Sequence, residues 1–283
     1  MIQEGIKTAN YREITKWNEV VQGGINAEIL VVGSSRALVH FDCEYIEKVS
    51  GKSCYNLGFD GTTYPLQKLM LKLYLDKNEQ PKEIIWSLDF HSFSDASNFY
   101  GFEQLIPYLS NYHVKEMLSL HKTPYYQFFI PIFRYSYNPK MKIIGLYSFL
   151  GNYSRKPILK KGYRYQDKVW DSTFINFVRR HPHGKDVAFE RAIYKDFEII
   201  SYELNSMLNL TWILTPYYYE AIEKISNRGK IKEYFINSSD SLNISFYDMS
   251  NNSISKNKNL FYNGSHMNQK GVNSFMKILF YTN

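Results

Sequence analysis

Two apolar patterns alternate along this chain, and their alternation predicts an α/β fold. A continuous apolar run of the length of a buried parallel strand occupies residues 28–33, and further strand-like segments occupy residues 53–58, 83–88, 211–215 and 244–249. Between these runs, apolar residues recur at helical spacing over residues 9–22, 41–49, 64–75, 187–208, 219–235 and 267–281. Helices that alternate with strands cover both faces of a mostly parallel sheet. We therefore predict a three-layer α/β/α, flavodoxin-like fold with a sheet of about five strands.

Two of the predicted helices carry recognisable boundary signals. Gly51 closes the helix that begins at about Phe41. Thr63 is placed to cap the helix over 64–75 with its side-chain oxygen, and Pro65 suits the first helical turn.

One long segment, residues 92–185, does not follow the alternation of strands and helices. It is rich in Tyr, Phe, Pro and His and has weaker periodicity, with helical stretches at 102–109, 113–120 and 141–150. We expect this aromatic-rich insertion to form a cap or cleft wall over the strand ends of a single domain that spans residues 1–283. A small separate subdomain is the alternative.

Composition and charge narrow the class of partner. Hydrophobic residues make up 44% of the 283 residues, which is typical of a globular chain, and the 25 Tyr suit a sugar-facing cleft. The net charge of +7 favours anionic partners, but no run of Lys and Arg marks a nucleic-acid surface. The sequence contains no uncharged apolar stretch of about 18 residues, so it predicts no membrane span. The first five residues lack signal-peptide character, so the protein is either cytoplasmic or anchored by a segment upstream of this sequence.

The two cysteines, Cys43 and Cys54, predict two separately buried thiols, which would pair only in an oxidising compartment. Their spacing is not that of a zinc site. His181 and His183 alternate in a loop with no acidic pair nearby. We therefore predict no metal site, and the chemistry considered below needs no cofactor.

Two short segments far apart in the sequence suggest the two halves of a serine-dependent site. The apolar run that ends at Val32 is followed by Gly33, Ser34 and Ser35, so Ser35 lies beyond the carboxyl end of a strand. His266 lies in a Gly- and Asn-rich loop just before the last predicted helix. A nucleophilic Ser needs such a base within hydrogen-bond reach and donors for the developing oxyanion.

These segments resemble motifs of the SGNH (GDSL-type) hydrolase family. Gly33-Ser34-Ser35 matches the first motif, Gly-Asp-Ser, with Ser34 in place of Asp. Asn263-Gly264-Ser265-His266 matches the last motif, Asp-x-x-His, with Asn263 in place of Asp. The resemblance implies that Ser35 is the nucleophile, His266 the general base, and Asn263 the residue that orients His266.

The resemblance also implies an oxyanion hole. Residues 56–63 are similar to the second motif, whose Gly gives a backbone N–H; Gly61 fits that position best and Gly58 is the alternative. The third motif, Gly-x-Asn-Asp, is not intact, because Asp89 and His91 follow the third strand instead. His91 could donate in place of the Asn, whereas Asp89 could not unless protonated. The implied donors are the N–H groups of Ser35 and Gly61, helped by His91.

Three further residues are candidates for substrate binding. Arg36 could face an anionic substrate, although a surface ion pair also explains it. Tyr217 and Tyr218 follow a strand end, where they could stack on a sugar or simply pack half-buried.

The Asn at position 263 has a chemical consequence. A carboxylate would stabilise the imidazolium that forms when His266 takes the Ser proton, but a neutral amide adds no charge. In Ser-His-Asp enzymes, replacing the Asp with Asn costs about 10⁴ in kcat through the wrong His tautomer. The site could therefore be slow, use another carboxylate such as Asp248, or be inactive.

We hypothesise that the chain hydrolyses or transfers an O-acyl group, acetyl in the first instance, on a carbohydrate. The likeness to the divergent SGNH branch that modifies envelope polysaccharides implies a cell-envelope setting and an acylated glycan or small ester as partner. The alternative is a degenerate member that binds glycan without turnover. A cytoplasmic esterase of small metabolites is a third interpretation.

Overall fold

A five-stranded parallel sheet forms the centre of the molecule, as predicted. The computed structural model describes residues 1–95, 101–124, 126–136, 138–151 and 159–281. The strand order is β2-β1-β3-β6-β7, and every neighbouring pair is parallel. The strands are β1 (Ile29–Gly33), β2 (Cys54–Asn56), β3 (Glu83–Leu88), β6 (Asn209–Leu214) and β7 (Ser245–Asp248). A separate antiparallel pair consists of β4 (Leu159–Lys160) and β5 (Tyr163–Arg164).

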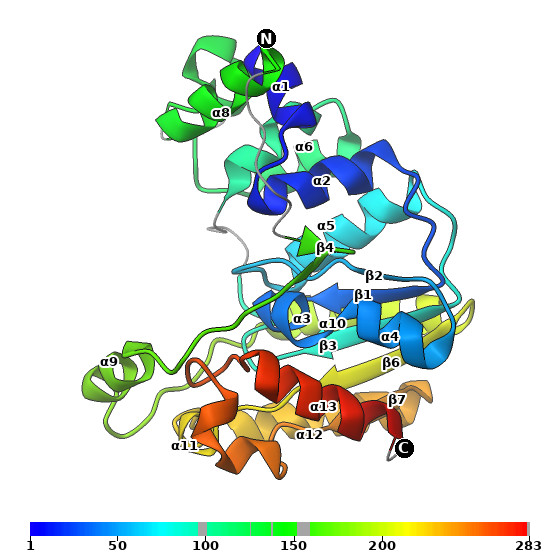
Figure 1. The fold of residues 1–283 in the computed structure, drawn as a ribbon, viewed down its shortest axis with the longest axis vertical. Helices are drawn as coiled ribbons and strands as arrows, with labels where there is room; N and C mark the ends of the chain where they lie inside the picture. The colour runs from blue at the N-terminus through cyan, green and yellow to red at the C-terminus, as the bar shows by residue number, and fades with distance from the viewer. Residues whose placement is uncertain (96–100, 125, 137, 152–158, 282–283) are drawn as a thin grey trace.

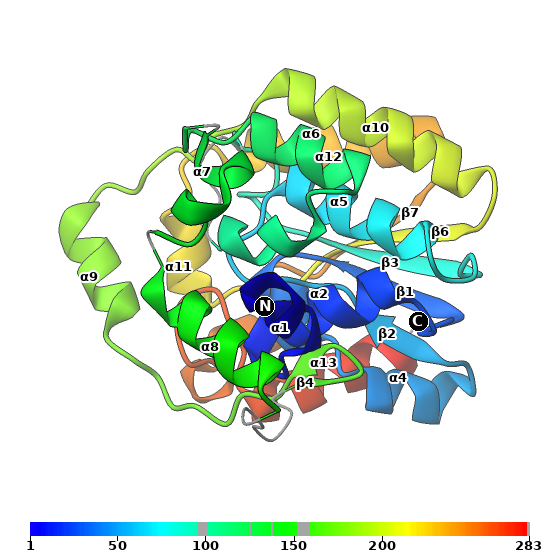
Figure 2. The same cartoon turned by 90° about the horizontal axis from the view of Figure 1, so that it is seen from above.

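Helices cover both faces of the sheet, which completes the three layers (Figures 1 and 2). None of the helices within the described ranges is long and apolar enough to cross a membrane. The α-helices are α1 (Ile2–Thr8), α2 (Arg12–Gln22), α3 (Ser35–His40), α4 (Cys43–Ser50), α5 (Tyr64–Leu75), α6 (Tyr112–Ser119), α7 (Tyr126–Phe129), α8 (Pro139–Phe149), α9 (Thr173–Arg180), α10 (Arg191–Asn205), α11 (Tyr219–Glu223), α12 (Arg228–Leu242) and α13 (Gln269–Tyr281). Short 3₁₀ turns are η1 (Phe102–Gln104), η2 (Ile106–Tyr108), η3 (Pro131–Phe133), η4 (Ile254–Lys256) and η5 (Lys258–Leu260).

Alternate residues of β1, β2, β3 and β6 bury their side chains in two separate cores, whereas β7 at the edge of the sheet is mostly exposed. On β3, Ile84 and Trp86 pack in the core that α2, α5, α10 and α12 share, whereas Ile85 packs in the core of α3, α4 and α13. Burial on both faces explains why β1 is apolar without interruption, since each face meets a helical layer. Figure 2 shows α10 on one side of the strands and α4 and α13 on the other.

Two local predictions were wrong, and one helix was not predicted. Residues 35–40, to which no element was assigned from the sequence, form α3. The single helix predicted over 219–235 is two helices, α11 and α12, and the side chain of Asn227 between them bonds both backbone groups of Val187. Thr63 occupies the N-cap position of α5, but its side chain makes no capping hydrogen bond.

The two parts of the predicted insertion lie in different places. The helices of residues 101–150 lie beside α1 and α2, where Gly5 and Gly145 bring the backbones of α1 and α8 into close contact (Figure 1). Residues 159–185 instead pass the carboxyl ends of the strands and carry α9, which projects outward there. Residues 96–100 and 152–158 of the segment lie outside the described residues, and its division into domain and cap stays a prediction.

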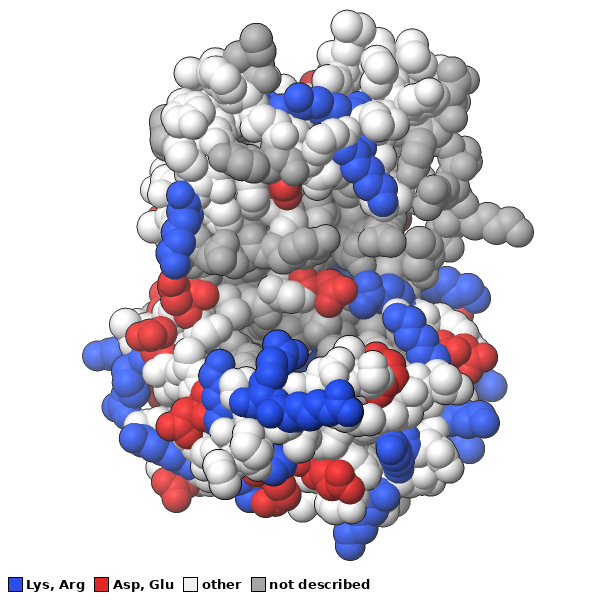
Figure 3. All heavy atoms as spheres, turned by 90° about the vertical axis from the view of Figure 1, so that its left-hand side faces the viewer, with Lys and Arg blue, Asp and Glu red and all other residues white. Residues whose placement is uncertain are grey.

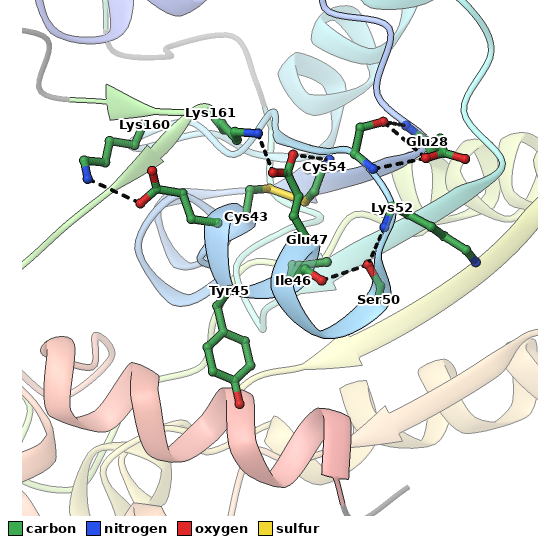
Figure 4. A network of polar contacts seen from close by, with 12 residues as sticks. Glu28, Cys43, Tyr45, Ile46, Glu47, Ser50, Lys52, Cys54, Lys160 and Lys161 are labelled. Carbon is green, nitrogen blue, oxygen red and sulfur yellow. Dashed lines mark hydrogen bonds and ion pairs between the residues drawn. A yellow bond between two sulfur atoms is a disulfide. The ribbon is translucent and has the colours of Figure 1, made fainter.

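The two cysteines form a disulfide, which corrects the expectation of separate thiols. Cys43 at the start of α4 bonds to Cys54 of β2, with Cα atoms 5.2 Å apart (Figure 4). Beside it, Lys160 and Lys161 form ion pairs with Glu44 and Glu47 of α4. The β4–β5 pair is thereby held against the edge of the domain, close to the start of the segment that reaches the strand ends.

Candidate active site

Ser35 lies at the turn between β1 and α3. Gly33 ends β1 with φ +152°, and a Cβ there would lie 2.7 Å from the carbonyl oxygen of Ser87, so this turn requires glycine. Ser34 caps α3 by accepting from the N–H of Arg36, and it donates to Asp89 Oδ2 at 2.5 Å. Ser35 is the first residue of α3 and its side chain is only half-buried, so the hydroxyl is held at the sheet edge within reach of a ligand.

His266 meets Ser35 across this edge. Ser35 Oγ and His266 Nε2 are 2.8 Å apart, within the range for a nucleophile and its base. The loop that carries His266 closes on itself, since Tyr262 N–H donates to the carbonyl of His266 at 3.1 Å. The Tyr262 ring also stacks on the imidazole, with centroids 5.4 Å apart and planes 8° from parallel.

Asn263 fixes the tautomer of His266. Its Oδ1 accepts the backbone N–H groups of Ser265 (3.1 Å) and His266 (3.0 Å), so the amide oxygen must face the loop. The same oxygen lies 3.0 Å from His266 Nδ1, which must therefore carry the proton. Nε2 is then left with its lone pair toward the Ser35 hydroxyl. This is the tautomer that a general base requires.

The surroundings of His266 keep the ring neutral. Burial, followed by the positive charge of Arg36, lowers the pKa of His266 to about 4. Arg164 acts in the same direction, whereas Asp60 and Asp89 oppose the shift. His266 is therefore unprotonated across the neutral range, but its conjugate acid is poorly stabilised.

Arg36 is buried, contrary to the expectation that it faces solvent or substrate. Only 3% of it is exposed, and its guanidinium lies 3.4 Å from the ring centroid of Tyr217. Its Nη atoms donate to the carbonyl oxygens of Ser265 (2.8 Å) and Thr215 (2.5 Å). Arg36 thus joins the nucleophile turn to the His266 loop and to the end of β6.

His40 also contacts the loop that carries His266. Its Nε2 accepts the N–H of Met267 at 3.0 Å, and its Nδ1 is 3.0 Å from Thr215 Oγ1. Burial holds the pKa of His40 well below its ordinary value, and the charge of Arg36 adds to this effect. The neutral ring can therefore keep accepting the Met267 N–H.

The predicted oxyanion donors differ in whether their N–H groups already have an acceptor. Gly58 N–H is already bonded to Asn56 Oδ1 at 2.8 Å, which disfavours the Gly58 alternative. Gly61 is exposed at φ +66°, and no acceptor for its N–H, or for that of Ser35, occurs within the described residues. His91 is exposed and lines a pocket beside Asn263. The roles of Ser35, Gly61 and His91 as donors stay predictions.

The remaining candidates have other partners. The side chain of Asp89 accepts hydrogen bonds from Ser34 Oγ and from His91 N–H, so it acts here as an acceptor and not as an oxyanion donor. Asp248 pairs with Lys232 at 2.8 Å and accepts from Ser250, so it is not the carboxylate of His266.

Tyr217 and Tyr218 are almost completely buried. Tyr217 is 3% and Tyr218 5% exposed, so half-buried packing, the alternative to sugar stacking, describes them better. Tyr218 packs edge-on against Trp170, and its hydroxyl is 3.0 Å from Glu220 Oε1.

Sequence reasoning missed the support around the dyad. Ser265 Oγ lies 3.1 Å from His266 Nδ1, Tyr262 covers the ring, and Thr215 joins Arg36 to His40. The positions of Ser265 and Tyr262 beside His266 in the loop were the available signal. Thr215 follows a predicted strand, but nothing in the sequence connects it to the loop.

Chemically, the arrangement is a hydroxyl whose proton a neutral, oriented imidazole can accept. Within the described ranges, no group of three or more His, Cys, Asp or Glu is arranged to hold a metal ion.

Comparison with known proteins adds little to this site. No protein-family model matches the chain, and no curated protein matches it in sequence. One solved structure with partial similarity to the chain is described as "a putative platelet activating factor from Streptococcus pneumonia". It shares 12% identity at a TM-score of 0.40, over 98% of this chain and 89% of that one.

Proposed function

We propose that this chain is a serine-dependent hydrolase or acyltransferase of the SGNH type that acts on O-acyl esters. The observation that carries the proposal is the aligned series Ser35 Oγ, His266 Nε2, His266 Nδ1 and Asn263 Oδ1, with separations of 2.8 and 3.0 Å. A nucleophile, a base and a residue that orients the base are the parts that acyl transfer requires.

The chemistry would proceed in two displacements. Ser35 Oγ attacks the acyl carbonyl carbon while its proton passes to His266 Nε2, and the carbonyl electron pair moves onto oxygen. His266 then returns the proton to the departing alcohol oxygen, which leaves an acyl ester on Ser35. In the second displacement water or an acceptor hydroxyl attacks this ester and gives its proton to His266 Nε2, the bond from the acyl carbon to Ser35 Oγ breaks, and His266 returns the proton to Ser35 Oγ. The N–H groups of Ser35 and Gly61 are the candidate oxyanion donors, with His91 as the third.

The substrate class we favour is an O-acetylated carbohydrate. The support is the motif resemblance together with the half-buried, accessible Ser35 at the sheet edge. The disulfide between Cys43 and Cys54 favours an oxidising compartment, and therefore the cell envelope over the cytoplasm.

A glycan-binding protein without turnover is the second candidate. Two observations favour it: the neutral Asn263, and Asp89 in the place of the family's oxyanion Asn, where it accepts hydrogen bonds only. A protein of this kind would bind an acylated glycan but would release no acetate from it.

Acetate release from p-nitrophenyl acetate and from acetylated xylo-oligosaccharide separates the two candidates. We expect Ser35→Ala to lower the rate by about 10³–10⁴, and a fluorophosphonate to label Ser35 in the unsubstituted chain. Ser34→Ala is the matched control for labelling, since that hydroxyl faces Asp89. An unchanged rate in Ser35→Ala, or absence of label at Ser35, would refute the serine mechanism.

A further inference from the structure

A pocket of about 320 Å³ is lined in part by Asn263, and neither Ser35 nor His266 is among its lining residues. Its volume lies at the lower end of the range for small-molecule sites. The walls are largely apolar and come from α9 and α11, through Phe174, Phe177, Ala221 and the neighbouring Ile225. The loop from Asn263 to Ser265 closes one side.

The polar side chains of this Asn263 pocket include hydrogen-bond donors but no carboxylate. Arg180 and His91 line it, and none of the lining residues in the described part of the chain is Asp or Glu. The Nε of Arg180 donates to the carbonyl of Asn176, and its terminal nitrogens have no acceptor among the described residues. Figure 3 shows Lys and Arg side chains across the middle of the face where Figure 1 places α9.

Asn263 contributes a donor as well. Its Oδ1 is committed to the His266 loop, so Nδ2 is the side-chain atom left for the pocket, and no acceptor for it occurs within the described ranges. A ligand oxygen bonded to Nδ2 would be separated from the imidazole only by the amide group. We propose that the Asn263 pocket binds an organic carboxylate with an apolar body, whose negative charge supplies beside His266 what Asn263 lacks.

Binding of a carboxylate in this pocket does not depend on the proposed function. Only its effect on turnover, through the pKa of His266, rests on that function. Arg36 and Arg164 are the charged groups that disfavour a proton on His266, Asp60 and Asp89 favour it, and the neighbouring His40 is neutral. An added carboxylate would act with the two acids and raise the pKa of His266. The carboxylate can belong to the substrate or to a separate effector.

Binding is tested on the Ser35→Ala protein by calorimetry with hexanoate and with the neutral analogue hexanamide. We expect hexanoate to bind roughly tenfold more tightly, and its saturation to raise the NMR-measured pKa of His266 by roughly one unit. Arg180→Gln should weaken hexanoate binding roughly fivefold to tenfold, whereas Arg179→Gln, an exposed neighbour outside the pocket, should not. Equal binding of the two ligands, equal effects of the two Arg substitutions, or an unmoved His266 pKa would each overturn the proposal.

Turnover of p-nitrophenyl acetate by the unsubstituted chain then identifies the source of the carboxylate. Activation by hexanoate indicates a separate effector, and competition indicates a subsite for an acidic substrate; no effect at saturation would overturn the link to the site. An absence of esterase activity would refute the proposed function but leave the binding results on Ser35→Ala intact, so the two failures are distinguishable.

Discussion

Asn263→Asp should convert His266 into a stronger base, and the structure allows the effect to be estimated. The substituted carboxylate would keep the two backbone N–H bonds that now reach Oδ1 and place a negative charge 3.0 Å from His266 Nδ1. At a charge separation of about 4 Å and an effective dielectric of about 20, the attraction is about 4 kcal/mol, or about 3 pKa units. The cost of desolvating the new carboxylate reduces this to roughly 1–2 units.

The pH dependence of kcat/KM is the assay. In the unsubstituted chain His266 has a pKa of about 4, so activity should be flat from pH 5 to 8 and fall only in stronger acid. In Asn263→Asp the raised pKa moves the acid limb up to roughly pH 5–6, so activity is lost earlier as pH falls. Above pH 7 the rate should rise roughly 10- to 100-fold, because the carboxylate stabilises the imidazolium of the transition state.

Asn263→Ala is the control for orientation. It removes the oxygen that holds His266 and the two loop N–H groups, so the rate should fall without an upward shift of the acid limb. NMR titration of His266 in both variants checks the assignment. If Asn263→Asp leaves both the acid limb and the neutral-pH rate unchanged, the idea that charge at position 263 limits the base is wrong.

Three stability predictions follow from the surrounding structure. Asn56→Ala should lower the unfolding free energy in urea by about 2–4 kcal/mol, because two carbonyls of the α3 region and one N–H lose their buried partner; equal stability would contradict this. Reduction of the Cys43–Cys54 disulfide, which closes a separation of 11 residues, should cost about 3 kcal/mol by the same measurement, with oxidised protein as reference. His40 and His266 have lowered pKa values in the folded state, so the unfolded chain binds more protons below about pH 6.5 and stability is lost as pH falls toward 4. His266 alone should contribute a loss of about 1–2 kcal/mol at pH 5, and a flat stability profile between pH 7 and 5 would refute the pKa directions.

The sheet and most helices were predictable because their signals are local. The β3 run and the α5 segment were predicted at the bounds that the structure gives, Glu83–Leu88 and Tyr64–Leu75. α3 was missed because its six residues carry no helical periodicity of their own. It is held instead by the Ser34 cap and by Asn56, which bonds two carbonyls of that region. Tertiary bonds of this kind leave no periodic trace in the sequence.

Sequence reasoning predicted that Ser35 and His266 meet, as they do, but not the charges around them. Ser35 and His266 were recognisable because each lies in a turn at a predicted strand end or helix start. The burial of Arg36 was not foreseeable, since its partners, Thr215 and Ser265, lie 179 and 229 residues away in the sequence. That buried cation changes the interpretation of the site, because it lowers the pKa of the base that it helps to position.

A conjugate-acid pKa of about 4 makes His266 a weak acceptor for the Ser35 proton. Relative to an ordinary imidazole, the deficit of about 2.5 units corresponds to about 3 kcal/mol in the protonated state. Two changes would offset it by the same physical route, Asn263→Asp and a carboxylate bound against Asn263. They should therefore not add: hexanoate should raise the His266 pKa in the unsubstituted chain and leave it unmoved in Asn263→Asp, where the Nδ2 donor is gone and the like charge repels the ligand. Additive shifts in an NMR titration of both proteins would show that the two charges reach His266 independently, and the pocket would then not adjoin Asn263 in the way argued above.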